Sequence, residues 1–232
     1  MTATTEDRLG YADLGGLLTR MTGDEKHTPS ATSTLDVLWV LYDQVLRIGP
    51  DTVDDPGRDR FLLSKGHGPA AYYAVLAAKG FFPAGWLDDF GSYESPLGYH
   101  PDRTRIPGVE ISSGSLGHGL LLGVGVALGL RAQGFTEAHS YVLLGDAELD
   151  EGSNHEAIAY AGATGLAGLT AVVVDNRSAT HGWPGGIGAR FAAHGWSTAT
   201  VDGRNHAALR AALTTPLPGR PHVVVASVDE AN

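Results

Sequence analysis

The chain has 232 residues, of which 43% are hydrophobic and 18% charged, so it is long enough to bury a sizeable core and has an ordinary globular composition. Its net charge of −10 argues against nucleic acid as the main partner, because phosphate backbones recruit Lys- and Arg-rich surfaces. The lack of cysteine excludes disulfides, thiolate catalysis and cysteine-ligated zinc, and no apolar run is long enough to cross a bilayer. Because the acidic N-terminus also lacks a signal-peptide pattern, we expect a cytoplasmic protein that binds no membrane.

The first half of the chain combines helical patterns with a short strand and a long loop. Apolar residues at helical spacing predict a helix over residues 34–48, with Ser33 as its N-cap. An apolar strand at 61–63 precedes a second predicted helix over 69–79. The stretch 91–107 is rich in Gly, Pro, Ser and Tyr, and we expect a loop there, which at this length is often functional.

Residues 117–132 have the apolar content of a helix but carry several glycines, each of which costs roughly 1 kcal/mol relative to alanine in a helix interior. Several glycines on one helix suggest close backbone approach to another element or to another chain. The alternative, a frayed glycine-rich loop, remains open at this point. The glycines inside this segment are Gly119, Gly123, Gly125 and Gly129.

In the second half, strands and helices alternate with short links. This pattern predicts an α/β fold, a mostly parallel sheet with helices on both faces, in which ligands bind at the carboxyl ends of the strands. We expect residues 1–232 to form one domain. The predicted strands cover 141–144, 170–174, 197–201 and 222–228, and the predicted helices cover 154–164, 187–194 and 206–213.

Two polar residues follow neighbouring predicted strands. Asp146 comes after the first of them, and Asn176 comes after the next strand, thirty positions later. A carboxylate and an amide oxygen, completed by water and phosphate oxygens, form the octahedral set that holds magnesium on a diphosphate. Alternatively, Asp146 only caps the following helix and Asn176 only serves a turn, and the spacing alone does not decide between these interpretations.

The segment Gly145-Asp146-Ala147-Glu148, followed by Glu151-Gly152 and by Asn176, resembles the signature of thiamine-diphosphate enzymes. The usual form is Gly-Asp-Gly, and alanine at Ala147 matters only if that position needs a positive φ. The resemblance implies thiamine diphosphate and Mg²⁺ as cofactors. It implies that Asp146, Asn176 and the backbone carbonyl of Ser178 are the metal ligands.

Further motifs are similar to the transketolase family and extend the resemblance over roughly residues 26 to 210. The element starting at His27 is a degraded His-Pro-Gly-Gly, in which both glycines are replaced. The matching segments are His27 to Ser33, Ser64-Lys65-Gly66-His67-Gly68, Gly98-Tyr99-His100-Pro101, Gly114-Ser115-Leu116-Gly117, and the acidic pair Glu151 and Glu156.

This resemblance implies a role for each matching residue. Histidines suit proton transfer because their pKa lies near working pH, so His67 would touch diphosphate and substrate, while His27 and His100 would orient or exchange protons with donor and acceptor. Glu151 and Glu156 would be a catalytic pair near a subunit interface. The expected cofactor-binding residues are His67, Gly114, Ser115, Leu116, Gly145, Asp146, Ala147, Glu148, Asn176 and His181.

Transketolases transfer a two-carbon ketol unit from a ketose phosphate to an acceptor. The family's aminopyrimidine-activating carboxylate lies in a separate pyrimidine-binding domain, so we expect a split-transketolase C-terminal-type subunit to supply it, in an α2β2 assembly. The chain alone would then be inactive. The family's Gly-Lys-Gly loop has no match before Asn232, from which we expect a weaker hold on diphosphate and a different donor or acceptor. A carrier-protein-bound acceptor in specialised biosynthesis is one such acceptor.

Two other interpretations stay open. The α subunit of a 2-oxo acid dehydrogenase or decarboxylase shares the Gly-Asp and Asn signature, but is not expected to have Ser-Lys-Gly-His-Gly in this order. A non-catalytic scaffold subunit would account for the replaced glycines after His27. The presence of Asp146, Asn176 and His100 argues against it.

Overall fold

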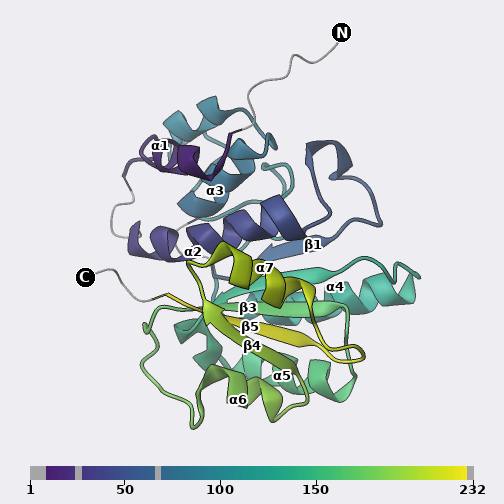
Figure 1. The fold of residues 1–232 in the computed structure, drawn as a ribbon. Coiled ribbons are helices and arrows are strands. Elements are labelled where there is room, and N and C mark those ends of the chain that lie inside the picture. The colour runs from purple at the N-terminus through teal and green to yellow at the C-terminus, as the bar shows by residue number, and fades with distance from the viewer. Residues whose placement is uncertain (1–8, 24–27, 66–68, 229–232) are drawn as a thin grey trace.

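Five parallel strands form one sheet in the computed structural model, which describes residues 9–23, 28–65 and 69–228 (Figure 1). The strand order is β1-β2-β3-β5-β4. Because all pairs are parallel, the carboxyl ends of β2 and β3 meet at one edge, with Gly145 in register with Val174. The strands are β1 (Arg60–Leu63), β2 (Ser140–Gly145), β3 (Leu169–Asp175), β4 (Ser197–Asp202) and β5 (His222–Ser227).

Helices cover both faces of the sheet, and strand residues alternate between the two cores (Figure 1). Val172 and Val174 of β3 pack into the first core, whereas Ala171 and Val173 pack into the second. The helices of the first face are α1 (Leu14–Leu18), α2 (Thr28–Val40), α3 (Ala70–Ala78) and α7 (His206–Thr214). Those of the second face are α4 (His118–Ala132), α5 (Gly152–Ala163) and α6 (Gly186–Ala192).

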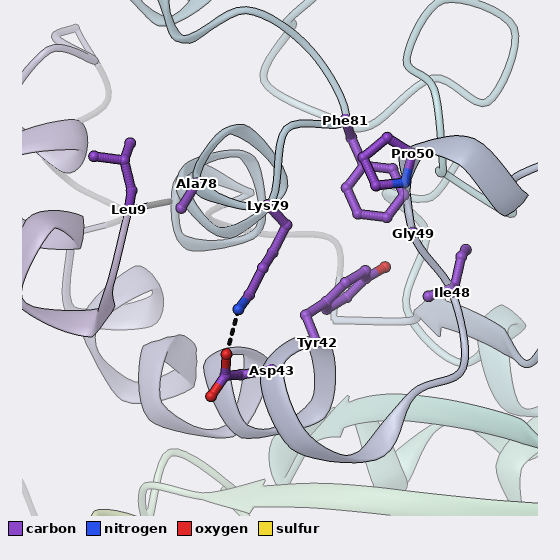
Figure 2. A pocket seen from close by; sticks show the side chains of 9 residues that line it. All are labelled: Leu9, Tyr42, Asp43, Ile48, Gly49, Pro50, Ala78, Lys79 and Phe81. Carbon is purple, nitrogen blue, oxygen red and sulfur yellow. Dashed lines mark hydrogen bonds and ion pairs between the residues drawn. The ribbon is translucent and has the colours of Figure 1, made fainter. Parts of the chain in front are cut away.

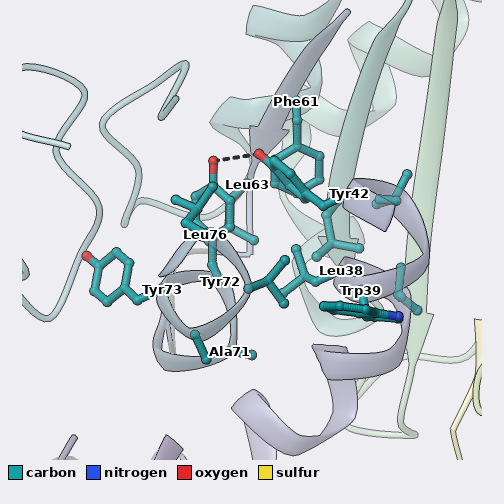
Figure 3. Close-up of a cluster of buried hydrophobic side chains, with 14 of the residues drawn as sticks. Leu38, Trp39, Tyr42, Phe61, Leu63, Ala71, Tyr72, Tyr73 and Leu76 are labelled. Atoms are coloured by element: carbon teal, nitrogen blue, oxygen red, sulfur yellow. Dashed lines mark hydrogen bonds between the residues drawn. The ribbon is translucent and has the colours of Figure 1, made fainter. Parts of the chain in front are cut away.

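The first core is rich in aromatic side chains (Figure 3). Tyr42 and Tyr72 are both buried, and their hydroxyls share a hydrogen bond of 3.0 Å, which satisfies both polar groups inside the core. Phe61 of β1 packs edge-on against Tyr42, with ring centroids 5.4 Å apart. These contacts fix α2 and α3 against the sheet.

Short helical turns complete the chain. The turn η6 occupies the link between β2 and α5, directly at the carboxyl edge, and η3 is a π-helical turn that follows α2. No helix in the described residues is long and apolar enough to cross a membrane. The turns are η1 (Tyr11–Asp13), η3 (Leu41–Val45), η4 (Pro50–Thr52), η5 (Ala84–Asp89) and η6 (Ala147–Asp150).

The predicted α/β fold is confirmed, and one helix start was predicted wrongly. α2 begins at Thr28, so Ser33 lies inside the helix, where it is buried rather than capping an end. Residues 91–107 contain neither helix nor strand, as expected. Residues 118–132 are helical despite their glycines.

Close packing explains two of the glycines in α4. A Cβ on Gly119 would lie 2.2 Å from Cβ of Ser64, and one on Gly123 would lie 2.4 Å from Cγ2 of Val142. The helix therefore rests with its backbone directly on β2 and the residue after β1. A Cβ added to Gly125 would meet nothing within 4 Å, so that side of α4 is open.

Candidate functional site

Asp146 lies at the carboxyl end of β2 and is only 3% exposed. Its Oδ1 accepts a hydrogen bond of 2.6 Å from the hydroxyl of Ser178, and its Oδ2 accepts one of 3.0 Å from the backbone N–H of Ala179. The loop after β3 is thereby attached to the end of β2. A carboxylate has about four lone-pair positions, so each oxygen keeps capacity for a further ligand.

Asn176 directly follows β3, on the strand next to that of Asp146. Its Oδ1 is buried and has no hydrogen-bond partner among the described residues. The turn after it contains Arg177 with φ 59°, the single non-glycine residue with positive φ among those described. Such a conformation costs of the order of 1 kcal/mol and is often found where function needs it.

The side-chain oxygens of Asp146 and Asn176 are of the kind that bind a magnesium ion. A buried amide oxygen without a partner beside a nearly inaccessible carboxylate gives the hard oxygen ligands that Mg²⁺ requires, and water and phosphate supply the rest. The described residues contain no group of three or more His, Cys, Asp or Glu side chains able to hold a metal by themselves. A magnesium ion here would therefore depend on the bound diphosphate.

Ala147 lies in η6 and does not have a positive φ. The replacement of the usual glycine by alanine in this signature is therefore compatible with the backbone.

Glu148 connects three segments of the site. Its carboxylate is 2% exposed and accepts hydrogen bonds from the hydroxyl of Ser64, from the N–H of Gly117 at 2.9 Å, and from the N–H of Gly145 at 3.3 Å. Burial raises the pKa of the Glu148 carboxyl, while these hydrogen bonds and the charge of Lys65 act in the opposite direction. The side chain is thus engaged inside the protein, where it fixes the ends of β1 and β2 and the start of α4.

His100 lies beside Gly114, so two of the motifs matched in the sequence are in contact. A Cβ on Gly114 would lie 2.8 Å from Cδ2 of His100, and the φ of Gly114 is 151°, so glycine is required for both space and conformation. The neighbouring Ser113 N–H donates to the carbonyl of Pro101 at 3.3 Å. Ser115 is exposed and Leu116 is half-buried on the same loop.

Glu151 and Glu156 are exposed, at the start and in the N-terminal half of α5. Gly117 packs against Glu151, since a Cβ on that glycine would lie 2.5 Å from Cβ of Glu151. Beside them Leu121, Leu122 and Tyr160 are 45%, 47% and 48% exposed. We call Leu121, Leu122, Gly125, Glu156 and Tyr160 the α4–α5 face.

Three expected site residues keep roles that rest on the resemblance alone. His27 and His67 lie outside the described residues. His181 is exposed in the loop after β3. Their predicted roles stay predictions.

Two residues near the site were missed by the sequence reasoning. Lys65 is largely buried, its Nζ donates to Oγ of Ser33 at 3.1 Å, and burial lowers the pKa of its ammonium to about 8 against the opposing charges of Asp146 and Glu148. Ser64 is buried against Glu148 and accepts from the N–H of Gly119 at 3.0 Å. Both belong to the Ser-Lys-Gly-His-Gly motif, so the signal was present in the sequence.

A cavity of about 280 Å³ lies between η3, α3 and the segment before β1 (Figure 2). Asp43 and Lys79 project into it and pair with each other. Arg47, just before this segment, binds Asp59 at the amino end of β1. The cavity is therefore near the opposite edge of the sheet from Asp146, and we assign it no part in the site.

The parallel sheet with polar residues at adjacent strand ends is the arrangement expected of a thiamine-diphosphate-binding fold. The family model described as transketolase, thiamine diphosphate binding domain, matches residues 22–225. The chain therefore belongs to the transketolase family. This result favours the transketolase interpretation over that of a 2-oxo acid dehydrogenase subunit.

Relatives and solved structures agree with this family. The chain is 35% identical over 208 residues to one of the apulose-4-phosphate transketolase subunits of Actinobacillus succinogenes, covering 87% of this chain and 75% of the relative. It resembles a transketolase from Pichia stipitis, solved in complex with xylulose 5-phosphate, with a TM-score of 0.78 and 26% identity. That match covers 94% of this chain and 36% of the solved one, so the chain spans about a third of that enzyme.

A further relative has a different kind of name. The chain is 56% identical over 218 residues to ferredoxin fas2 of Rhodococcoides fascians, covering 94% of this chain and 72% of the relative. Ferredoxin clusters are held by cysteine thiolates, and the 232 residues here contain none. In this chain, the region shared with that relative therefore offers no cysteine ligands for such a cluster.

Proposed function

We propose that this chain is the thiamine-diphosphate- and Mg²⁺-binding subunit of a split transketolase, which transfers a two-carbon ketol unit from a ketose phosphate. Activity requires a partner subunit that carries the pyrimidine-binding domain. The observation that carries the proposal is that a buried carboxylate, Asp146, and a buried amide oxygen without a partner among the described residues, Oδ1 of Asn176, follow neighbouring strands. An amide oxygen buried without a partner is costly, and a metal ion offsets that cost.

The residues of this chain bind and orient, and the cofactor supplies the carbanion chemistry when bound. Asp146, Asn176 and the carbonyl of Ser178 hold the metal, and Gly114 to Leu116 and Gly145 to Glu148 form the surrounding backbone. His100 is exposed and lies against Gly114, and its exposure supports a role in exchanging protons with a sugar hydroxyl. His27, His67 and His181 complete the proposed set.

The partner subunit is proposed to pack on the α4–α5 face. Leu121, Leu122 and Tyr160 are about half exposed, which is unusual for large apolar side chains grouped on two adjacent helices. Gly125 leaves room for close approach of another backbone. The relatives named as transketolase subunits, including the apulose-4-phosphate enzyme, support an assembly of more than one kind of chain. An α2β2 tetramer in the cytoplasm fits this scheme.

The donor is proposed to be a ketose phosphate. One relative, from a Clostridium strain, is named as a 6-deoxy-6-sulfo-D-fructose transketolase subunit, and that name supports an anionic ketose as the donor. An acceptor attached to a carrier protein is the specialised alternative. Rapid turnover with free pentose phosphates would argue against such an acceptor.

The test is a two-component assay with this chain, the partner subunit, thiamine diphosphate and Mg²⁺, using xylulose 5-phosphate and other ketose phosphates as donors. The proposal predicts ketol transfer only when both chains are present. Asp146→Asn should abolish it. The matched control is Asp202→Asn, a carboxylate at the end of β4 on the same edge of the sheet, which should retain it. Full activity of Asp146→Asn would refute the proposal.

A further inference from the structure

Lys65 is placed at the proposed diphosphate site by the backbone. The N–H groups of Ser64 and Lys65 both donate to the carbonyl of Leu143, at 2.9 and 3.1 Å, so the chain leaving β1 stays beside β2. The side chain then runs across Gly145, with Cδ 3.5 Å from the position that a Cβ would occupy there. The side chain of Lys65 is thus within van der Waals contact distance of the end of β2.

The ammonium group of Lys65 lies between α2 and the end of β2. Its Nζ donates to Oγ of Ser33 at 3.1 Å, which uses one of its three N–H donors. Ser33 is 5% exposed, so this end of the lysine is held inside the protein rather than in solvent. Lysine is seldom buried without an anionic partner.

Two carboxylates near Lys65 are already engaged by other donors. Glu148 accepts from Ser64, Gly117 and Gly145, and Asp146 accepts from Ser178 and Ala179. Their charges act on Lys65 electrostatically, but no hydrogen bond joins either of them to Nζ among the contacts of the described residues. The lysine thus keeps donor capacity at the place where a diphosphate would bring negative charge.

We propose that Lys65 is a diphosphate-binding residue, whose ammonium group pairs with phosphate oxygens on the side of the site formed by α2 and the end of β2. The inference rests on the proposed function and adds to it a cation that belongs to the chain itself. A magnesium ion held by Asp146 and Asn176 would neutralise part of the diphosphate charge. Lys65 neutralises a further part, so that a diphosphate beside two buried carboxylates becomes tolerable.

The experiment measures binding of inorganic pyrophosphate with Mg²⁺ to the chain, and of thiamine diphosphate with Mg²⁺ to the chain with its partner, by calorimetry. Lys65→Met keeps the length of the side chain and removes the charge, and we expect about 10- to 100-fold weaker binding of both probes. Lys65→Arg should lose only a few-fold. Affinity should depend less on salt in Lys65→Met than in the unchanged chain, since one screened ionic contact is gone.

Lys79→Met is the matched control. Lys79 is the other described lysine and pairs with Asp43 at the distant cavity (Figure 2). Its ammonium lies 3.9 Å from the ring centroid of Trp39. Its replacement should leave the affinity for both probes unchanged. Lys65→Gln serves as a second neutral variant if Lys65→Met does not fold, as judged by circular dichroism.

The outcomes separate the two proposals. Unchanged affinity in both neutral variants, with binding lost in Asp146→Asn, would overturn the role of Lys65 and leave the proposed function standing. Equal losses of affinity in Lys65→Met and Lys65→Arg, with an unaltered salt dependence of binding, would also overturn it. Such a result would indicate that the lysine side chain acts only by filling space. Absence of binding to the unchanged chain, with and without its partner, would overturn both proposals.

Discussion

The hydroxyl of Ser178 donates a 2.6 Å hydrogen bond to Oδ1 of Asp146, and so joins the loop after β3 to the residue that follows β2. The bond crosses the edge where two parallel strands end. It positions the loop that carries Asn176, whose Oδ1 has no hydrogen-bond partner within the described ranges. The hydrogen bonds that Asp146 accepts therefore fix the loop on which the Oδ1 acceptor of Asn176 lies.

Asn176→Ala should separate stability from function. Because Oδ1 of Asn176 has no partner in the part of the chain that the structure describes, its removal should leave the free energy of unfolding unchanged or raise it by up to about 1 kcal/mol without ligand. Magnesium-dependent binding of the cofactor should be lost. Urea unfolding and calorimetry measure the two effects.

Asn205→Ala is the control for that variant. Asn205 caps α7 by accepting from the N–H of Ala208 at 3.0 Å, so its loss should cost about 1 kcal/mol while cofactor affinity stays the same. A large loss of stability in Asn176→Ala would mean that its amide is a structural group after all.

Gly123→Ala and Gly125→Ala should change stability in opposite directions. The Cβ at position 123 would lie 2.4 Å from Cγ2 of Val142, so we expect a loss of about 1–3 kcal/mol from overpacking. The Cβ at position 125 meets nothing within 4 Å, so the helix should gain up to about 1 kcal/mol. Thermal unfolding of both variants tests this, and destabilisation by Gly125→Ala would contradict the open side of α4.

Leu122→Glu should weaken association with the partner subunit without unfolding this chain. Leu122 is 47% exposed on the α4–α5 face, so the charge is tolerated in the free chain but would be buried in the assembly. Leu217→Glu, at a 58% exposed leucine in the link between α7 and β5, is the control. Sedimentation of the mixed subunits gives the affinity, and equal association of both variants would exclude this face.

His139 should make stability fall in acid. Burial lowers its pKa from 6.5 to about 4, and its Nε2 shares a 2.9 Å hydrogen bond with Oγ1 of Thr170. The unfolded chain takes up the proton first, so this contribution is present above pH 6.5 and is lost towards pH 4. Between pH 7 and pH 5 the loss should be roughly 2 kcal/mol greater than in His139→Gln, measured by urea unfolding. Parallel pH profiles would disprove the effect.

The sequence predicted the strands and the carboxyl edge of the sheet well, because the local pattern there has one physical cause. Runs such as Val172 to Val174 are β-branched and buried, so the strands and the edge at which Asp146 and Asn176 meet follow directly from them. The order of the strands could not be read from the same pattern, because it depends on which elements pack together.

Side-chain direction was the harder part to predict. Ser33 was expected at a helix end, because serine favours N-caps, but it lies inside α2, where its Oγ accepts a hydrogen bond from Lys65. Lys65 is partly buried although lysine is usually exposed, and no local pattern reveals that its side chain lies against Gly145. Glu148 carries a charge, yet its carboxylate is directed inward to donors from three segments that are far apart in the sequence.

The most direct test of the account is calorimetric titration of thiamine diphosphate in the presence and absence of Mg²⁺, on this chain alone and together with its partner subunit. The account predicts binding that requires magnesium, tightens sharply with the partner, and disappears in Asp146→Asn. Binding that is equally tight without magnesium, or that survives in Asp146→Asn, would contradict the site at the ends of β2 and β3.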